Sequence, residues 1–265
     1  MIRIFRPSLL CCFPAVLLFV LGGNPGADER EGAPVGEGDR LCTFRVDSGG
    51  VVMQPVARLP VVMHLAPDLP RAISDVAIEA MKRWNRGWAA YLMAEYGGDP
   101  FGTGKTDAGV VSLRLFEWRS SEKSLEAAHD GVNVIVLSEG APARRMASTP
   151  ISWNSGPRVS ASPGRRDTRS PITDADIEIY MHERPRVNYG DGPPGRREID
   201  ALSVMAHELG HVLGLGHPDP EEDTVMTFPL REGIRVLPSA RDYDNLMCVY
   251  AAGLRRRYND GSPVR

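Results

Sequence analysis

The sequence predicts a single α+β domain in which a mixed β-sheet is flanked by helices. Three observations lead to this prediction: several short apolar runs typical of strands, one long helical stripe in the first half of the chain, and a second helical stripe near the C-terminus. The length of 265 residues, of which 42% are hydrophobic, is sufficient for one sizeable core.

Residues 1–27 are predicted to be a secretory signal peptide. Arg3 and Arg6 precede an uncharged, mostly apolar run at 7–23, which is too short and wrongly flanked for a comfortable membrane span. Cleavage is expected at 23–27, and an uncleaved anchor is the alternative. The segments that follow are a flexible linker at 28–39, rich in Gly, Pro and acidic residues, the folded domain at 40–253 and a polar tail at 254–265.

Apolar and β-branched runs predict the strands of the sheet, at 61–65, 110–116, 132–137 and 176–181. A long helix is predicted after the first strand, with Ser74 as its N-cap and Gly97 and Gly98 as its stop. We assign its apolar stripe to the core, because an aromatic stripe more often packs inside than binds a ligand. The stripe consists of Ile73, Val76, Ala77, Ala80, Met81, Trp84, Trp88, Tyr91 and Leu92.

A last helix is predicted from Ser239 to Ala252, where Asp242 lies three residues after Ser239, as in a weak capping box. Its apolar positions are Tyr243, Leu246, Met247 and Tyr250. Residues 141–171, rich in Arg, Ser, Pro and Gly, are predicted to be a solvated loop, and an ordered rim of a cleft is the alternative. Four arginines in this loop would favour acidic substrates, although such charge runs are more often plain surface. These are Arg144, Arg145, Arg165 and Arg166.

The chemistry of the chain is concentrated in the run HELGHVLGLGH at 207–217. His207 and His211 are four residues apart, so on a helix they share one face about 6 Å apart along the axis. That separation suits two ligands of one cation. Glu208 points roughly 100° around the helix, beside the cation, and suits a residue that handles a water molecule.

His217 adds a geometric demand that a chance HExxH on a solvated helix does not meet. On a continued helix it would lie about 15 Å along the axis from His207, so the helix must end between them. Gly214 and Gly216 permit this, because glycine adopts the positive-φ conformation that ends helices. Three imidazoles with an open fourth position predict one catalytic Zn²⁺, although iron, cobalt or nickel would fit the same nitrogens.

These residues, followed by Met226 in TVM, resemble the metzincin metallopeptidases, whose zinc motif HExxHxxGxxH is followed by a methionine-containing turn. Within that clan the chain is most similar to a short bacterial matrixin-type catalytic domain. DADIEIYM at 174–181 resembles the strand ahead of the zinc helix, and SARDYDNLMCVY at 239–250 resembles the closing helix. The resemblance implies a mostly parallel, twisted sheet with a long N-terminal helix, an active-site helix, a Met-turn and a C-terminal helix.

Three departures from the family pattern limit what the resemblance implies. Phe228 stands where astacin-like and serralysin-like members have a zinc-binding tyrosine, which leaves three protein ligands. Cys42 lies in RLCTFRV, unlike the PRCGxPD context of the matrixin propeptide, so no switch role is assigned to it. His182 lacks the partners of the family's second, structural zinc, and Ca²⁺ sites are left open.

The resulting hypothesis is a zinc-dependent endopeptidase. His207, His211 and His217 would hold a zinc ion that lowers the pKa of its bound water. Glu208 would take a proton from this water as a general base and return it to the leaving amine.

The resemblance also implies where the substrate lies. An extended peptide would run along the strand at 176–181 at the sheet edge, residues 227–238 would wall the pocket beside the metal, and Met226 would pack beneath it. Two alternatives stay open. One is a catalytically silent metal-binding or adhesive module, against which the retained Glu208 argues; the other is a zinc hydrolase of a non-peptide amide or ester.

Charge and cysteine content bound the partners. Lys and Arg number 31 against 34 acidic residues, a net charge of −3, which predicts neither a nucleic-acid partner nor, after signal cleavage, a membrane partner. A secreted or extracellular monomer acting on a peptide or protein substrate is expected, with periplasmic and membrane-anchored locations as alternatives. Cys42 and Cys248 remain after cleavage and predict a disulfide, with two buried thiols as the alternative.

Overall fold

The computed structural model describes residues 52–54, 59–97, 114–138, 146–149, 151–153, 168–181, 186–218, 220 and 222–259. The predicted signal peptide and linker lie outside these ranges, as do Cys42, His182 and the four arginines of the predicted loop. The disulfide between Cys42 and Cys248 therefore stays a prediction. Within the part of the chain that the structure describes, no helix combines the length and apolar character needed to cross a bilayer.

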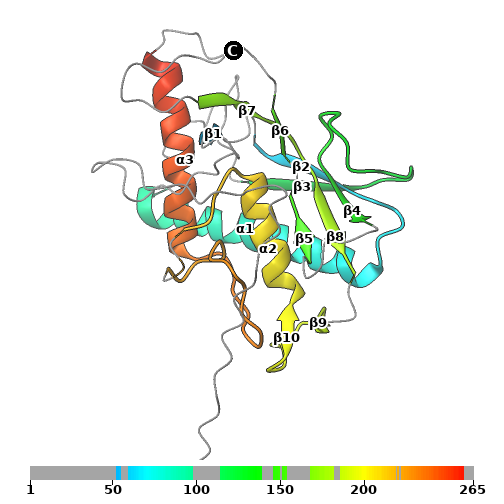
Figure 1. The fold of residues 1–265 in the computed structure, drawn as a ribbon. Helices are drawn as coiled ribbons and strands as arrows, with labels where there is room; N and C mark the ends of the chain where they lie inside the picture. Colours follow the sequence, from blue (N-terminus) through cyan, green and yellow to red (C-terminus); the bar gives the residue numbers. More distant parts are fainter. Residues whose placement is uncertain are drawn as a thin grey trace, which may run out of the picture.

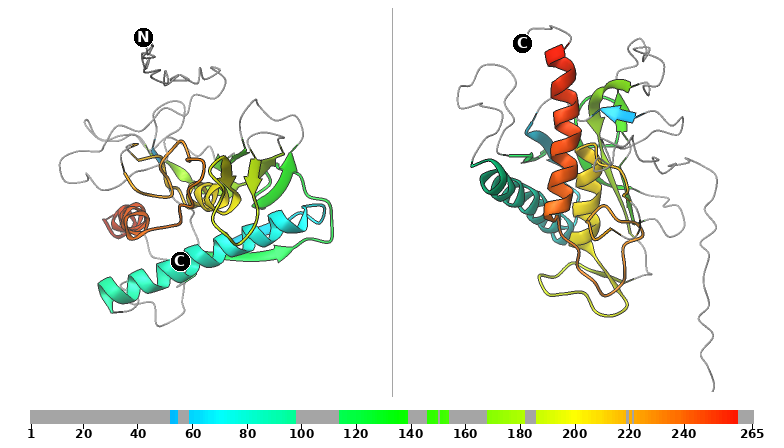
Figure 2. Two further views of the ribbon diagram at one scale, coloured as in Figure 1. Left: turned by 90° about the horizontal axis from the view of Figure 1, so that it is seen from below. Right: turned by 90° about the vertical axis from the view of Figure 1, so that its left-hand side faces the viewer.

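The described residues form three helices, α1 (Arg71–Tyr96), α2 (Ala201–Val212) and α3 (Ala240–Asn259). The long helix α1 packs against both of the others and against the sheet, and in the view of Figure 1 it passes behind α2 and α3 (Figures 1 and 2). The predicted core stripe of α1 is confirmed, with seven of its residues buried and Val76 and Tyr91 packed against them. Gly97 ends the helix in the left-handed conformation, at a φ of 68°.

The main sheet has the strand order β3-β2-β4-β8-β5. Its strands are β2 (Val61–Leu65), β3 (Phe116–Ser120), β4 (Val134–Ser138), β5 (Ala147–Ser148) and β8 (Ile177–Tyr180). Four of them are parallel, and β5 alone runs antiparallel to its neighbour β8. Alternate residues of β2 are buried in the core, as expected for a strand with one face inside. The α+β fold with a mixed, mostly parallel sheet is thereby confirmed.

Two smaller sheets flank this one. The first has the order β1-β7-β6 and consists of β1 (Val52–Gln54), β6 (Ile151–Trp153) and β7 (Thr168–Ala175). The second pairs β9 (Arg186–Asn188) in parallel with β10 (Glu198–Asp200), which leads directly into α2.

The starts of α1 and β3 differ from the prediction. The helix α1 begins at Arg71 after Pro70, whose fixed φ suits a helix start, so Ser74 lies inside the helix and is not its N-cap. Of the strand predicted at 110–116, residues 110–113 lie outside the described ranges, and β3 begins only at Phe116 and continues through polar residues to Ser120. An edge strand exposes one side to water, so its polar sequence does not show the apolar pattern on which the prediction relied.

The predicted solvated loop at 141–171 is partly an ordered rim. It contains β5, β6 and the start of β7, and Thr149 between β5 and β6 is only 4% exposed. The expectation of a solvated loop is therefore wrong for these described residues. The strand at 176–181 is confirmed as β8, but it is not the sheet edge that a peptide was expected to extend, because β5 pairs with Glu178 and Ile179 and is itself the edge.

The last helix is longer than predicted. Its apolar positions are buried as expected, and Asp242 accepts hydrogen bonds from the amide and hydroxyl of Ser239, at 2.8 Å each. The helix continues to Asn259, into the segment predicted as a polar tail. Arginine is a good helix former, so a polar composition at 255–257 does not stop the helix.

Aromatic side chains join the three helices. Trp84 and Trp88 of α1 are fully buried, and the indole N–H of Trp84 donates to the carbonyl of Ala206 in α2 at 2.9 Å. Tyr243 of α3 meets Trp84 edge-on, with ring centroids 5.6 Å apart. Gly87 makes this approach possible, because a Cβ there would lie 1.9 Å from the Tyr243 hydroxyl.

Two buried carboxylates organise the turn ahead of β4. Asp176 accepts hydrogen bonds from the amides of Val134 and Ala128, and Asp174 accepts from those of Asp130 and Gly131. Burial, together with the charges of Asp174 and Asp130, raises the pKa of Asp176 to about 7 against the pull of its backbone hydrogen bonds.

Candidate metal centre

The helix α2 presents the first two histidines. Its N-cap is Asp200, whose carboxylate accepts from the amide of Ser203 at 3.0 Å. His207 and His211 lie one turn apart on this helix, and both are buried. The predicted zinc helix is confirmed as an element of the fold.

The helix ends between His211 and His217, as their spacing requires. Gly214 has a φ of 92°, its amide donates to the carbonyl of His211, and the amide of Leu215 donates to the carbonyl of Gly210. These two bonds form a Schellman motif, which closes the helix and reverses the chain. Gly214 alone makes the turn, since Gly216 does not adopt a positive φ.

This turn brings the three imidazoles together. Nε2 of His217 lies 3.1 Å from Nε2 of both His207 and His211, and the latter two nitrogens are 3.2 Å apart. Nitrogens about 2.05 Å from one tetrahedral zinc ion would be roughly 3.3 Å apart. The observed spacing therefore fits a single ion of this size.

The far nitrogens of two of these rings are fixed by backbone carbonyls. Nδ1 of His207 lies 2.8 Å from the carbonyl oxygen of Val225, and Nδ1 of His211 lies 2.9 Å from that of Leu215. A carbonyl only accepts, so Nδ1 is the protonated nitrogen in the neutral rings and Nε2 carries a lone pair. Lone pairs facing each other across 3.2 Å are unfavourable without a cation, so this donor set fits a metal ion.

The turn that contains Val225 and Met226 packs against α2 and contacts His207. Met226 is 1% exposed, and Gly210 of α2 faces it so closely that a Cβ at Gly210 would lie 2.2 Å from the Met226 sulfur. Val225, whose carbonyl holds His207, donates its own amide to Asp242 of α3 at 3.2 Å. Burial raises the pKa of Asp242, whose Oδ1 has no hydrogen-bond partner among the described residues. Val225 thus links α3 to His207, because its amide contacts Asp242 and its carbonyl contacts the imidazole.

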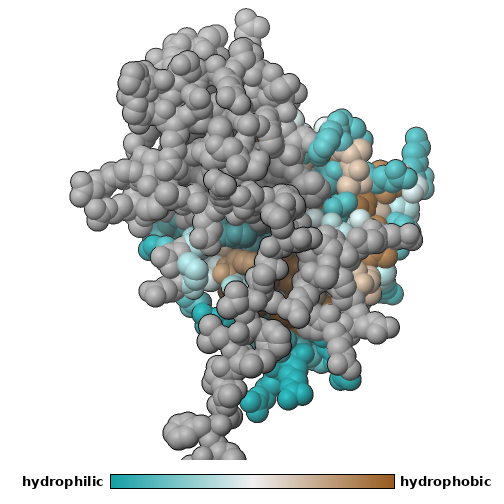
Figure 3. Space-filling view, in the orientation of Figure 1, coloured by the Kyte–Doolittle hydropathy of each residue, from teal (hydrophilic) through white to brown (hydrophobic). Residues whose placement is uncertain are grey.

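Phe228 lies on the outer side of the centre. Its ring is 59% exposed and stacks on the imidazole of His217, with centroids 5.4 Å apart and planes at 21°. Apolar surface also appears where β4 and β8 lie (Figure 3), and exposed apolar residues there are Leu137 of β4 and Met181 after β8. Exposed apolar side chains are therefore found both against His217 and on β4 and after β8.

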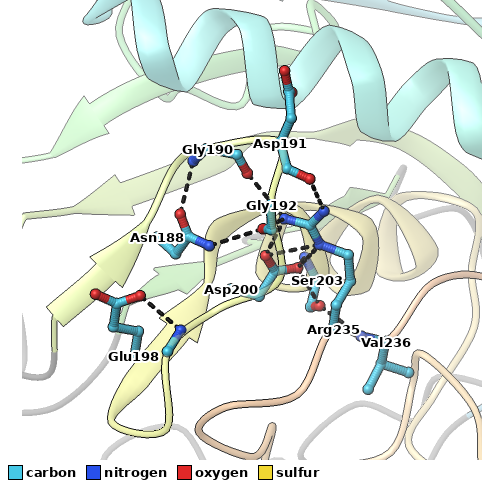
Figure 4. A network of polar contacts seen from close by, with 10 residues as sticks. Asn188, Gly190, Asp191, Gly192, Glu198, Asp200, Ser203, Arg235 and Val236 are labelled. Atoms are coloured by element: carbon cyan, nitrogen blue, oxygen red, sulfur yellow. Dashed lines mark hydrogen bonds and ion pairs between the residues drawn. The ribbon is translucent and has the colours of Figure 1, made fainter.

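Arg235 anchors the segment that follows the methionine turn (Figure 4). Its guanidinium makes a forked contact with Asp200, the N-cap of α2, at 2.8 to 3.1 Å. It also donates to the carbonyls of Gly190, Asp191 and Gly192, at 2.6 to 2.9 Å. One side chain thus ties the segment at 227–238 to the start of the helix that carries His207.

Glu208 has a partner that the sequence did not reveal. Its carboxylate Oε2 accepts a hydrogen bond from the Thr149 hydroxyl at 2.6 Å, and both side chains are buried. Thr149 is 59 residues away in the sequence and belongs to the segment predicted as a loop. No local motif marks it, so a knowledge of the strand order is needed to find it.

The family of the chain follows from comparison with known proteins. Residues 74–250, more than half of the sequence, match the matrixin family. The chain belongs to the matrixin family. As a matrixin it is a metalloendopeptidase, and the family together with the histidine cluster supports zinc as its metal. A search of curated proteins with the sequence of this chain found no match.

Among solved structures, this matrixin is similar to high choriolytic enzyme 1, a hatching enzyme zinc-protease from the medaka fish Oryzias latipes. The identity is 10%, the match covers 79% of this chain and 94% of that one, and the TM-score is 0.31. At that TM-score the likeness bears on neither the fold nor the function.

Proposed function

We propose that this matrixin is a secreted zinc endopeptidase in which His207, His211 and His217 hold the ion and Glu208 is the general base. The convergence of three Nε2 atoms, two of them backed by backbone carbonyls, is the observation that carries the proposal. The retained carboxylate next to the ligands favours catalysis over a silent metal-binding module, because a purely structural zinc site is ordinarily closed by a fourth ligand.

Zinc, when bound, supplies Lewis-acid activation of the attacking water and of the scissile carbonyl. The chain's own residues supply the rest. The carbonyls of Val225 and Leu215 hold two of the ligand rings in orientation. Glu208 takes a proton from the attacking water and returns it to the nitrogen of the leaving amine as the C–N bond breaks.

The structure suggests a different strand for the substrate than the sequence did. Among the described residues, β5 is the outermost strand of the main sheet, and it runs antiparallel to β8. Its next residue, Thr149, contacts Glu208. We place the extended peptide against β5, where backbone hydrogen bonds would align the scissile bond with the centre.

The test is cleavage of a peptide library by the purified mature protein, with and without a chelator. Glu208→Gln should lower the cleavage rate by about 10²- to 10⁴-fold while zinc content stays the same. The matched control Glu126→Gln, at an exposed position, should behave like wild type. Elemental analysis of the same samples identifies zinc and reports any calcium.

Two results would count against the proposal. Intact peptides together with hydrolysis of a non-peptide amide or ester would indicate a different substrate class. A Glu208→Gln protein as active as wild type would contradict the general-base role.

We also propose export, supported by the charged start and apolar run at 1–23. N-terminal sequencing of protein from the culture medium should place the cleavage site at 23–27.

Mass spectrometry without reductant should show Cys42 linked to Cys248, and sedimentation should show a monomer. Two free thiols would remove the disulfide without affecting the proposed chemistry.

A further inference from the structure

We infer that Thr149 is a positioning residue that fixes the carboxylate of Glu208, an inference that rests on the proposed function. The Thr149 hydroxyl has one hydrogen to give and two acceptors of Glu208 within reach. Glu208 Oε2 is 2.6 Å away, and the backbone carbonyl of the same residue is 3.3 Å away. The shorter distance falls in the range of a charge-assisted O–H···O⁻ bond, so the hydroxyl donates its hydrogen to the carboxylate and not to the backbone carbonyl.

The contact is sheltered from water. Thr149 is 4% exposed and Glu208 is 8% exposed. A hydrogen bond to a carboxylate in such surroundings is stronger than the same bond at the surface, because little water competes for either partner. The bond therefore restrains the Glu208 side chain effectively.

Thr149 is itself held in place by the sheet. It directly follows β5, in which Ser148 pairs with Glu178 of β8. The amide of Tyr180 donates to the carbonyl of Met146 at 2.8 Å, and the Tyr180 hydroxyl lies 3.0 Å from that of Ser148. The contacts of β5 with β8, and the packing of β5 against α2, give the hydroxyl a fixed position relative to that helix.

This arrangement has a consequence at the level of atoms. Oε2 already accepts the hydrogen of Thr149, and we assign to Oε1 the proton that the attacking water gives up and the leaving amine receives. The same strand that aligns the peptide backbone thus also aligns the base. Catalytic groups need placement within fractions of an ångström, so loss of this restraint should slow the chemical step more than binding.

The experiment compares Thr149→Val, which keeps the shape and removes the hydroxyl, with Thr149→Ser, which keeps the hydroxyl. Thr149→Val should lower kcat roughly ten- to a hundredfold with KM within about twofold, and Thr149→Ser should restore kcat to within about threefold of wild type. Thr173→Val makes the same chemical change at an exposed position in β7 and should leave both constants unchanged.

A readout without turnover completes the test. A high-resolution crystal structure of wild type should show Thr149 Oγ1 within hydrogen-bond distance of Glu208 Oε2, and that of Thr149→Val should show the Glu208 carboxylate rotated or disordered. If Thr149→Val fails to fold, the wild-type distance decides, and a separation beyond about 3.5 Å overturns the inference.

Failure of this inference is distinguishable from failure of the proposed function. A folded, zinc-loaded Thr149→Val protein with wild-type kcat overturns the role of Thr149, provided that Glu208→Gln is inactive. An active Glu208→Gln protein overturns the proposed function itself.

Discussion

Gly210 shows how a single residue without a side chain supports the centre. It lies on α2 one position before His211, and a Cβ there would lie 2.2 Å from the sulfur of buried Met226 and 3.4 Å from Trp84. The turn that contains Met226 and the helix α1 therefore both pack closely against α2 at Gly210.

Gly210→Ala should destabilise the protein by about 1 to 3 kcal/mol. Alanine has a better helix propensity by about 1 kcal/mol, but the displacement of Met226 in a packed core outweighs this gain. Chemical denaturation of the metal-free protein measures the change. Gly192→Ala is the matched control, since a Cβ there meets no atom within 4 Å. A stabilised Gly210→Ala variant would contradict the packing described here.

Asp176 makes stability depend on pH. Its pKa is raised to about 7 in the folded protein, mainly by burial and also by the charges of Asp174 and Asp130. Between the ordinary pKa of an aspartate, about 4, and this value, the folded state keeps a proton that the unfolded state has lost. The stabilising contribution is fully present below pH 4 and is lost as the pH rises to 7, with a slope of up to about 1.4 kcal/mol per pH unit.

Asp176→Asn should remove this dependence. The variant should be less stable overall, because an amide nitrogen cannot accept the second of the two backbone N–H bonds. Urea unfolding at a series of pH values from 4 to 8 measures the slope. A variant with the same slope as wild type would assign the pH dependence to other groups.

At the residue scale, local spacing made the centre predictable and long-range pairing limited the prediction. His207, His211 and His217 lie within eleven positions, so helix geometry and the glycines between the last two indicated that the three rings converge. Thr149 reaches the same place through the pairing of β5 with β8. That pairing depends on strand order, which residue spacing does not encode.

Among the elements, the segment at 227–238 is attached to the start of α2 by an ion pair and by a hydrogen bond. Asp200 has a fully buried side chain, and the Arg235 side chain is 20% exposed. Ser203 of the first helical turn contributes a further link, because its hydroxyl accepts from the amide of Val236 at 2.8 Å. The N-terminus of α2 and this segment should therefore loosen together.

Arg235→Met should cost about 3 kcal/mol, the low end of the range for breaking a buried pair, because the arginine is partly exposed. Arg235→Lys keeps the charge but loses the fork, and a cost of about 1 to 2 kcal/mol is expected. Hydrogen exchange should speed up at 190–192 and 233–236 in both variants.

The surface pair of Arg241 with Glu222 provides the matched control. Arg241 is 45% exposed and Glu222 is 28% exposed, so Arg241→Met should cost less than about 1 kcal/mol. Equal losses of stability in the two variants would show that the ion pair of Arg235 with Asp200 contributes no more than a surface pair.

Elements with a strong internal pattern were predicted well. The helix α1 and the strands β2, β4 and β8 lie close to their predicted positions, because burial imposes an apolar period on the sequence. The edge strand β3 and the two-residue strand β5 carry little such signal, since their polar side chains face water or pair across the sheet. The end of α3 escaped prediction because charged residues extend a helix as readily as they form a tail.

On the scale of the whole molecule, metal and fold should be thermodynamically coupled. The three histidines proposed as ligands come from α2 and from the chain beyond it, and their Nε2 atoms meet only in the folded state. A ligand that binds the folded state alone stabilises it by about 2.7 kcal/mol at a concentration a hundredfold above its Kd.

Chelation should therefore lower the Tm, and added zinc should restore it. His217→Ala should remove most of this zinc-dependent shift, whereas His129→Ala, at an exposed position, should retain it. Scanning calorimetry with and without zinc makes the comparison. A Tm that does not respond to zinc in wild type would contradict a metal site formed by folding.

The position of Trp84 gives this protein a built-in optical reporter. Its indole touches the backbone of α2 one residue before His207 and is fully shielded from solvent. Once the other three tryptophans, Trp88, Trp118 and Trp153, are replaced by phenylalanine, its emission should be blue-shifted while the two helices stay docked and should move to longer wavelength as soon as they separate. Spectral changes could thus follow the integrity of the centre in real time, without any substrate or added dye.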